Sequence, residues 1–222
     1  MSRQNDHLQQ SLLCAGAFLA WFTTRMLIAT GLANFGLQGT PFALCLALLS
    51  DFLVILSLYY YSRRYVTNIT FGALRPSSLL IFTGLLLALM IFNGLYAKQE
   101  SWMTQISLHY RTVLPLIFLA ILFLAPIGEE IMFRGFVLQG LFLWFPRQRF
   151  ACALLTSLIF ASMHVQYQHW QTVIALSLFS LLMCYARLFS GGLILPVTLH
   201  IIHNAIASLA WWQLNHLPGL SE

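Results

Sequence analysis

Seven apolar segments, each about as long as a membrane-spanning helix, constrain this chain of 222 residues more than any other feature. A helix needs roughly 20 residues to cross a hydrocarbon core of about 30 Å. We therefore predict an all-α integral membrane protein that forms one structural domain, a bundle of about seven transmembrane helices. The segments are 12–33, 41–61, 78–97, 112–145, 150–167, 170–189 and 193–213.

The fourth segment, 112–145, is too long for one simple span. At about 1.5 Å per residue it would measure on the order of 50 Å, so it must tilt, bend near Pro126, or continue as a partly buried helix. An eighth crossing, made from the second half of this segment, is the alternative.

The positive charges between the segments favour one orientation. With seven spans and a cytoplasmic N-terminus, most of the arginines lie inside and few cations lie outside, as the positive-inside rule requires. An eighth crossing would move three of these arginines to the outside, so the charges favour seven spans and an external C-terminus. The inside arginines are Arg3, Arg63, Arg64, Arg75, Arg147, Arg149 and Arg187, and the outside cations are Lys98 and Arg111.

Composition narrows the class of protein further. Charged residues make up 8% of the chain and hydrophobic residues 59%, whereas soluble domains carry about 25% charged residues. The net charge of +5 is spread over loops between apolar segments, so we expect a lipid bilayer and no nucleic acid as a partner. The four cysteines lie in separate apolar segments, which predicts neither disulfides nor a metal site. The N-terminus lacks the pattern of a removed signal peptide.

Two adjacent carboxylates and an arginine lie within the fourth segment, at Glu129, Glu130 and Arg134. Each charge at membrane depth costs roughly 2.5–3.5 kcal/mol on insertion scales, so the group must be paired or functional. In a helix Glu130 and Arg134 share a face, whereas Glu129 points about 100° away. We predict that Arg134 pairs with Glu130 and leaves Glu129 free for chemistry. A purely structural ion cluster is the alternative.

Two later spans also carry polar residues at membrane depth. His164 follows Phe160 by four residues near the far end of the fifth segment, which places both on one helix face. His200 and Asn204 are four residues apart in the last segment and share a face in the same way. We interpret His203, which points elsewhere, as a packing or supporting residue.

Two chemistries fit these residues, and both hydrolyse an amide. Glu129, His164 and His200 could bind zinc and leave a position open for an activated water. Without a metal, Glu129 would take a proton from water that His164 helps to align, and His200 with Asn204 would donate hydrogen bonds to the oxyanion. We favour the second, which requires no cofactor, because Asn204 is a poor zinc ligand and a good oxyanion donor.

The remaining motifs and charges say less about function. The HExxH pattern of soluble zinc proteases, the GxSxG pattern of serine hydrolases and a glycine-rich phosphate loop are all absent from the sequence. Arg25 in the first span and Asp51 in the second are expected to pair with each other across neighbouring helices.

The patterns EExxxR, FxxxH and HxxxN occur in that order, at Glu129–Arg134, Phe160–His164 and His200–Asn204. In this respect the chain resembles the CPBP family, which comprises the type II CAAX prenyl endopeptidases and the bacteriocin self-immunity (Abi) proteins. The resemblance covers residues 125–204, about a third of the chain. It divides the chain into three spans without a motif, residues 1–111, and a catalytic core, residues 112–213.

The resemblance implies an intramembrane endopeptidase that cleaves near the C-terminus, or within a membrane-embedded segment, of a membrane-associated protein or peptide. By similarity Glu129 and His164 activate the water, His200 and Asn204 form the oxyanion site, and Glu130 with Arg134 supports that geometry. The family is described both as metalloproteases and as glutamate-type proteases. The short chain resembles bacterial members, for which a bacterial inner (plasma) membrane and a non-prenylated substrate are expected.

Two other functions stay open at this stage. A non-catalytic protein of the immunity type would use the same cluster to bind a peptide or partner. A proton- or ion-coupled transporter would use Glu129, Glu130 and His164 as a relay, although the sequence lacks the internal symmetry that transporters often show. The oligomeric state is left open.

Overall fold

The computed structural model describes residues 3–96, 98, 100–102 and 110–216, and in these residues every regular element is helical, which confirms the predicted all-α class. The first part of the chain forms α1 (Arg3–Asn34), α2 (Pro41–Ser62) and α3 (Pro76–Gly94). The second part forms η1 (Arg111–Val113), α5 (Leu114–Leu119), η2 (Ala120–Leu124), α6 (Ala125–Glu129), η3 (Glu130–Val137), α7 (Leu138–Trp144), α8 (Arg149–Ser162), α9 (Trp170–Ser190) and α10 (Ile194–His216).

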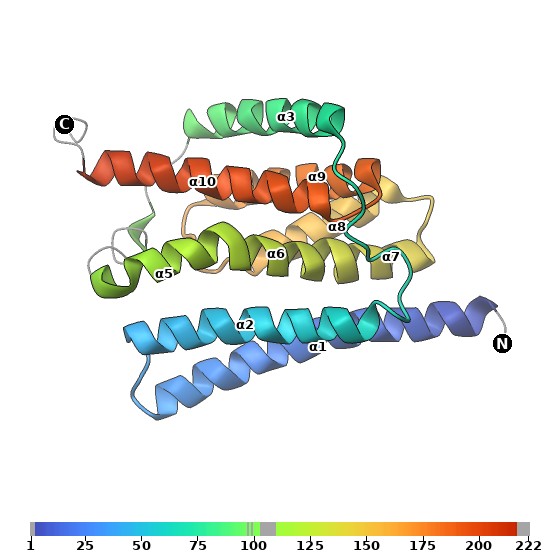
Figure 1. Ribbon diagram of the computed structural model, residues 1–222, viewed down its shortest axis with the longest axis horizontal. Helices are drawn as coiled ribbons and strands as arrows, with labels where there is room; N and C mark the ends of the chain where they lie inside the picture. The colour runs from blue at the N-terminus through green and yellow to red at the C-terminus, as the bar shows by residue number, and fades with distance from the viewer. Residues whose placement is uncertain (1–2, 97, 99, 103–109, 217–222) are drawn as a thin grey trace.

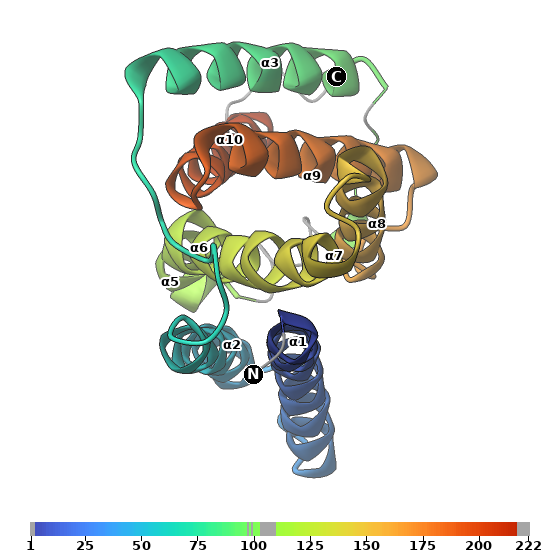
Figure 2. The same cartoon turned by 90° about the vertical axis from the view of Figure 1, so that its right-hand side faces the viewer.

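The helical run from α5 to α7 lies in the middle of the bundle (Figures 1 and 2). Helices α1 and α2 pack on one side of it, whereas α8, α9 and α10 lie on the other side. Helix α3 is outermost, against α9 and α10. The three motif-bearing elements therefore enclose the centre, with the motif-free helices on the outside.

Six helices of the described chain are long and apolar enough to cross a membrane. The shorter α8 makes a further pass between α7 and α9, so seven successive passes run in alternate directions. As a result α1 begins and α10 ends at opposite ends of the bundle (Figure 1). Large apolar side chains such as Leu80, Ile91 and Leu27 are mostly exposed, as expected of surfaces that face lipid. The run Leu114–Trp144 continues without reversing, so the eighth crossing is not found among the described residues.

The fifth pass, α8, differs from the sequence prediction. The fifth apolar segment was expected to be helical over 150–167, but α8 has 14 residues and ends at Ser162. At 1.5 Å per residue it measures roughly 21 Å, less than the membrane core of about 30 Å. His164 therefore lies in the turn beyond α8, and its placement on a helix face was wrong.

At the end of α8 a side chain bonds a carbonyl of the last turn. The last carbonyls of a helix have no intrahelical partner, and the Nδ1 atom of His164 lies 2.7 Å from the carbonyl oxygen of Phe160. The irregular segment that follows is tolerated at membrane depth because it lines a cavity. This early end brings His164 into the centre of the bundle.

The segment between α2 and α3 ties the outer helices to the core. Its Thr70 and Phe71 carbonyls accept hydrogen bonds from the N–H groups of Leu193 (3.0 Å) and Ile194 (2.8 Å), at the start of α10. The buried Arg187 donates to the carbonyl of Asn68. Arg187 is therefore a structural residue at the bundle end, and it is also one of the inside arginines counted from the sequence.

One smaller prediction is confirmed. Arg25 Nε lies 3.4 Å from Asp51 Oδ2, so the expected pair joins α1 and α2. All four cysteines are free.

Candidate active site

The centre of the bundle holds a fully buried ion pair. Arg134 Nη1 lies 3.0 Å from Glu130 Oε1, and neither side chain is exposed. Arg134 Nη2 donates to the carbonyl oxygen (3.0 Å) and the hydroxyl (2.8 Å) of Ser180 on α9. The guanidinium also lies over the ring of Phe160 on α8, 5.0 Å from the ring centroid. The predicted Glu130–Arg134 pair thus joins three helices, and the sequence patterns did not indicate Ser180.

Glu130 also holds a catalytic candidate on a fourth element. The Nδ1 atom of His200 on α10 lies 2.8 Å from Glu130 Oε1. Because a carboxylate oxygen accepts, Nδ1 carries the proton and the opposite nitrogen, Nε2, is turned towards Glu129, 3.8 Å from its Oε2 atom. Glu130 therefore orients His200, a link that the sequence patterns did not indicate.

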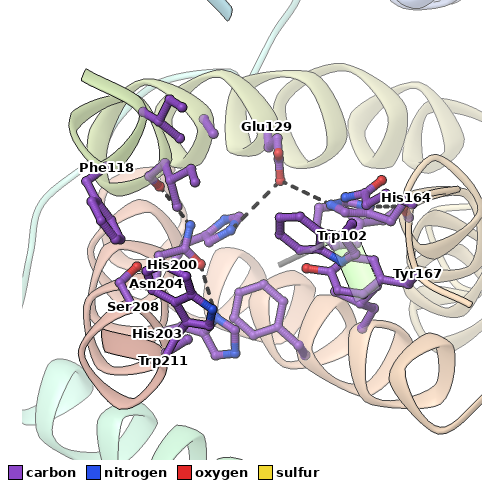
Figure 3. A pocket seen from close by; sticks show the side chains of 18 of the residues that line it. Trp102, Phe118, Glu129, His164, Tyr167, His200, His203, Asn204, Ser208 and Trp211 are labelled. Carbon is purple, nitrogen blue, oxygen red and sulfur yellow. Dashed lines mark hydrogen bonds and ion pairs between the residues drawn. The ribbon is translucent and has the colours of Figure 1, made fainter. Parts of the chain in front are cut away.

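Glu129 differs from its neighbour in exposure. Its side chain is 26% exposed and faces a pocket in which it meets two imidazoles (Figure 3). Glu129 Oε2 lies 4.0 Å from His164 Nε2, on the side opposite to His200. Since Nδ1 of His164 bonds a carbonyl oxygen, that nitrogen is the donor and Nε2 is the atom that faces Glu129.

Two π-helical stretches, η2 and η3, flank Glu129 in the central run. Such stretches are rare and are frequent at functional sites. In the first, the Ala125 N–H bonds to the Ala120 carbonyl, and the next residue, Pro126, has no N–H to give. The Ile121 carbonyl therefore lacks both of its usual backbone donors, and Asn204 Nδ2 supplies one at 2.8 Å.

This bond fixes the orientation of the Asn204 amide. Because the Ile121 carbonyl can only accept, the nitrogen of the amide faces it and the oxygen faces the other way, 3.1 Å from His203 Nδ1. The amide nitrogen carries two hydrogens, and one is left for another acceptor. His203 thus supports Asn204 directly, in line with its interpretation as a supporting residue.

The pocket has a volume of about 240 Å³ and brings together Glu129, His164, His200 and Asn204 (Figure 3). The rest of its wall is mainly apolar and includes Trp102, which the sequence suggested as an interfacial anchor, and Tyr167. Trp102 and Tyr167 pack edge to face with ring centroids 5.4 Å apart.

Glu100 fastens the rim of this pocket. Its carboxylate accepts hydrogen bonds from the N–H groups of Gln168 (3.0 Å) and His169 (3.3 Å) and from the hydroxyl of Thr172 (2.6 Å). These donors lie at the start of α9, where backbone N–H groups have no helical partner. Burial acts to raise the pKa of Glu100, but the hydrogen bonds outweigh it and hold that pKa below its ordinary value.

The donor atoms for the zinc alternative come near one another without forming a metal site. Glu129, His164 and His200 meet at 3.8–4.0 Å, but in the part of the chain that the structure describes no group of three or more His, Cys, Asp or Glu residues could hold a metal ion.

Comparison with known proteins finds a family match over the part of the chain that contains the polar residues of the pocket. Residues 111–206 match the family described as type II CAAX prenyl endopeptidase Rce1-like, which confirms the predicted resemblance. An uncharacterized 24.3 kDa protein of Escherichia coli is 43% identical over 83 residues, which are 37% of this chain and 38% of that protein. The chain thus matches well under half of that relative's length. No solved structure gives a significant match.

The Arg134 side chain is expected to require its planar fork as well as its charge. In Arg134→Lys an ammonium keeps the charge, but it cannot bond Glu130 Oε1 and both oxygens of Ser180 as the guanidinium does. We expect the free energy of unfolding to fall by about 1–3 kcal/mol. Thermal unfolding in detergent measures this, with Ser180→Ala, which removes only the hydroxyl, expected between the wild type and Arg134→Lys. A Lys variant as stable as the wild type would contradict the structural role of the fork.

The cap formed by Glu100 makes a pH-dependent contribution to stability. Because its pKa is lowered in the folded protein, the contribution is present above the unfolded pKa of about 4.3 and is lost as pH falls through the lower, folded pKa. We therefore expect Glu100→Gln to unfold at a lower temperature than the wild type at pH 7. The gap should narrow in strongly acidic solution. A gap that widens on acidification would mean that Glu100 is not an ionised cap.

Proposed function

We propose that this chain, in which residues 111–206 match the CAAX endopeptidase family, is an intramembrane endopeptidase that uses a glutamate-activated water. The observation that carries the proposal is the convergence of Glu129 with His164 and His200, whose Nε2 atoms lie 4.0 and 3.8 Å from Glu129 Oε2, inside a mainly apolar pocket. Three separate elements supply these groups, so their meeting is a property of the fold.

Glu129 acts as the general base. A water placed between Glu129 Oε2 and His164 Nε2 can donate one hydrogen to each, because two acceptors about 4 Å apart suit a bridging water. Glu129 takes the proton as the water oxygen bonds the carbonyl carbon of the substrate, and returns it to the amine when the C–N bond breaks. General bases of this kind contribute about 10²–10⁴-fold in rate.

Asn204 and His200 bind the oxyanion. The second hydrogen of Asn204 Nδ2 is free for it, since the first is bound by Ile121 and the amide oxygen by His203. His200 must carry protons on both nitrogens to take part, one shared with Glu130 and one on Nε2. The carboxylates of Glu129 and Glu130 lie on either side of the ring to balance that charge.

The mechanism needs no metal, and the proton acceptor and oxyanion donors are all side chains of this chain. The substrate is a membrane-associated protein or peptide, because the pocket lies halfway along the central run and its wall is mainly apolar. Similarity to a protein of Escherichia coli supports a bacterial inner membrane, and the loop arginines support a cytoplasmic N-terminus.

The decisive variant is Glu129→Gln, which keeps the shape and removes the base. With purified protein in lipid nanodiscs and a library of membrane-segment peptides, mass spectrometry would detect the new termini. We expect cleavage by the wild type and a loss of about 10²–10⁴-fold in Glu129→Gln. Glu222→Gln is the matched control, since it makes the same change 18 residues beyond the last motif residue and should retain activity.

Metal content is measured on the same samples. Cleavage that depends on Glu129 at negligible metal content is the expected result. Stoichiometric zinc that is lost in His164 or His200 variants would replace the proposal by the zinc-dependent one. Equal biological activity of the wild type and Glu129→Gln would show that the pocket binds a partner without hydrolysis.

The two histidines of α10 are expected to differ. His200→Ala removes a group that faces Glu129 and also leaves Glu130 without one of its donors, whereas His203→Ala only releases the Asn204 amide. We expect kcat/KM to fall by about 10²–10³-fold for His200→Ala and by less for His203→Ala. The reverse order would mean that His203 is the oxyanion donor.

A further inference from the structure

Glu129 also faces a second cavity, on the side of the central run that α1 and α2 cover. This cavity has a volume of about 240 Å³, and Glu129 and His164 are part of its wall. Arg25 and Asp51 line it as well. His200 and Asn204 do not line it; they belong to the first pocket. Glu129 therefore lies between the proposed oxyanion donors, in the first pocket, and the Arg25–Asp51 ion pair, in the second cavity.

The second cavity continues towards one end of the bundle. A third cavity, of about 280 Å³, shares Arg25 and Asp51 with it and reaches Gln38 and Gly39, in the turn between α1 and α2. Asp51 lies ten residues beyond the start of α2 at Pro41, roughly 15 Å along the helix axis. The ion pair thus stands about halfway between the helix ends, where the two cavities meet.

The walls suit water better than an apolar ligand. Arg25 lines both cavities. Its guanidinium lies 3.4 Å from Asp51 through Nε and 5.3 Å from the centroid of the Trp21 ring. Trp21, also in the wall, is almost fully buried, and its indole N–H has no hydrogen-bond partner among the described residues. Buried donors of this kind are usually satisfied by ordered water.

We propose that these two cavities are the route by which water reaches Glu129, entering at the α1–α2 turn and passing the Arg25–Asp51 pair. The inference rests on the proposed function, since hydrolysis consumes a water at each turnover. The substrate carbonyl must lie in the first pocket, beside His200 and Asn204, and a bound substrate would block water from that side. The second cavity reaches the opposite side of Glu129 and stays open. The Arg25–Asp51 pair keeps the route hydrated at membrane depth.

Water in the cavity is tested without any substrate. Leu48 lines the second cavity, whereas its neighbour Leu49 is exposed on the outer surface of α2 at the same depth. We would place Leu48→Cys and Leu49→Cys proteins in nanodiscs and treat each with a small cationic methanethiosulfonate. Because only the hydrated thiolate reacts, Leu48→Cys should be modified at least about tenfold faster. Peptide mass spectrometry locates the label and separates it from the four native cysteines.

The ion pair is tested in the same assay. Adding Arg25→Met and Asp51→Leu to Leu48→Cys should slow the modification of the thiol at position 48 about tenfold or more. The reason is that an apolar contact between α1 and α2 at this point excludes water. Equal rates for Leu48→Cys and Leu49→Cys, or a rate unchanged by loss of the ion pair, would overturn the proposal and indicate a lipid-filled wedge.

Turnover provides the second readout. Leu48→Trp fills the second cavity, and Leu49→Trp is its matched control on the outer surface. We expect Leu48→Trp to lower kcat about tenfold with KM unchanged, since the substrate site is untouched. A raised KM with unchanged kcat would show that substrate occupies the second cavity and would overturn the water route. If the wild type cleaves nothing, the proposed function fails, whereas the labelling result still decides whether the cavity holds water.

Discussion

The carboxylate of Glu130 is the contact on which the rest of the site depends. One of its oxygens receives both Arg134, at 3.0 Å, and His200, at 2.8 Å, in a fully buried position. Through Arg134 the same contact reaches Ser180 and Phe160, so α8, α9 and α10 are all held to the central run. Removing one member of such a cluster leaves a buried charge without its partner. We therefore expect the loss of any one member to disrupt the whole cluster.

The backbone of the central run is irregular next to Glu129. A regular α-helix would satisfy the Ile121 carbonyl internally and leave nothing for Asn204 to bind. The π-helical stretch and Pro126 together free that carbonyl, and Asn204 crosses from α10 to meet it at 2.8 Å. The sequence showed the proline and the length of the run but not the hydrogen-bond pattern, because a π-helical stretch has no distinctive residue pattern.

The parts that the sequence predicted well are those decided by hydrophobic length and by local spacing. Apolar segments of about 20 residues became the long helices, and the i, i+4 spacing of Glu130 and Arg134 became an ion pair. The end of α8 was missed because the apolar stretch gives no stop signal, and it is the imidazole of His164 that satisfies the last turn. Contacts between distant segments, such as His200 with Glu130 or Glu100 with α9, depend on packing that no local pattern encodes.

The two neighbouring glutamates show how one helix can serve two purposes. Adjacent residues point about 100° apart on a helix, so Glu130 enters the packed interior while Glu129 faces open space. Glu130 Oε1 accepts from both Arg134 and His200, and this contact holds His200 in place. Glu129 has no such direct bond; it has imidazoles at 3.8 and 4.0 Å and a cavity on either side. A base in that position can reach a substrate from one cavity and a water from the other, and this requires α1 and α2 to cover the central run without sealing it.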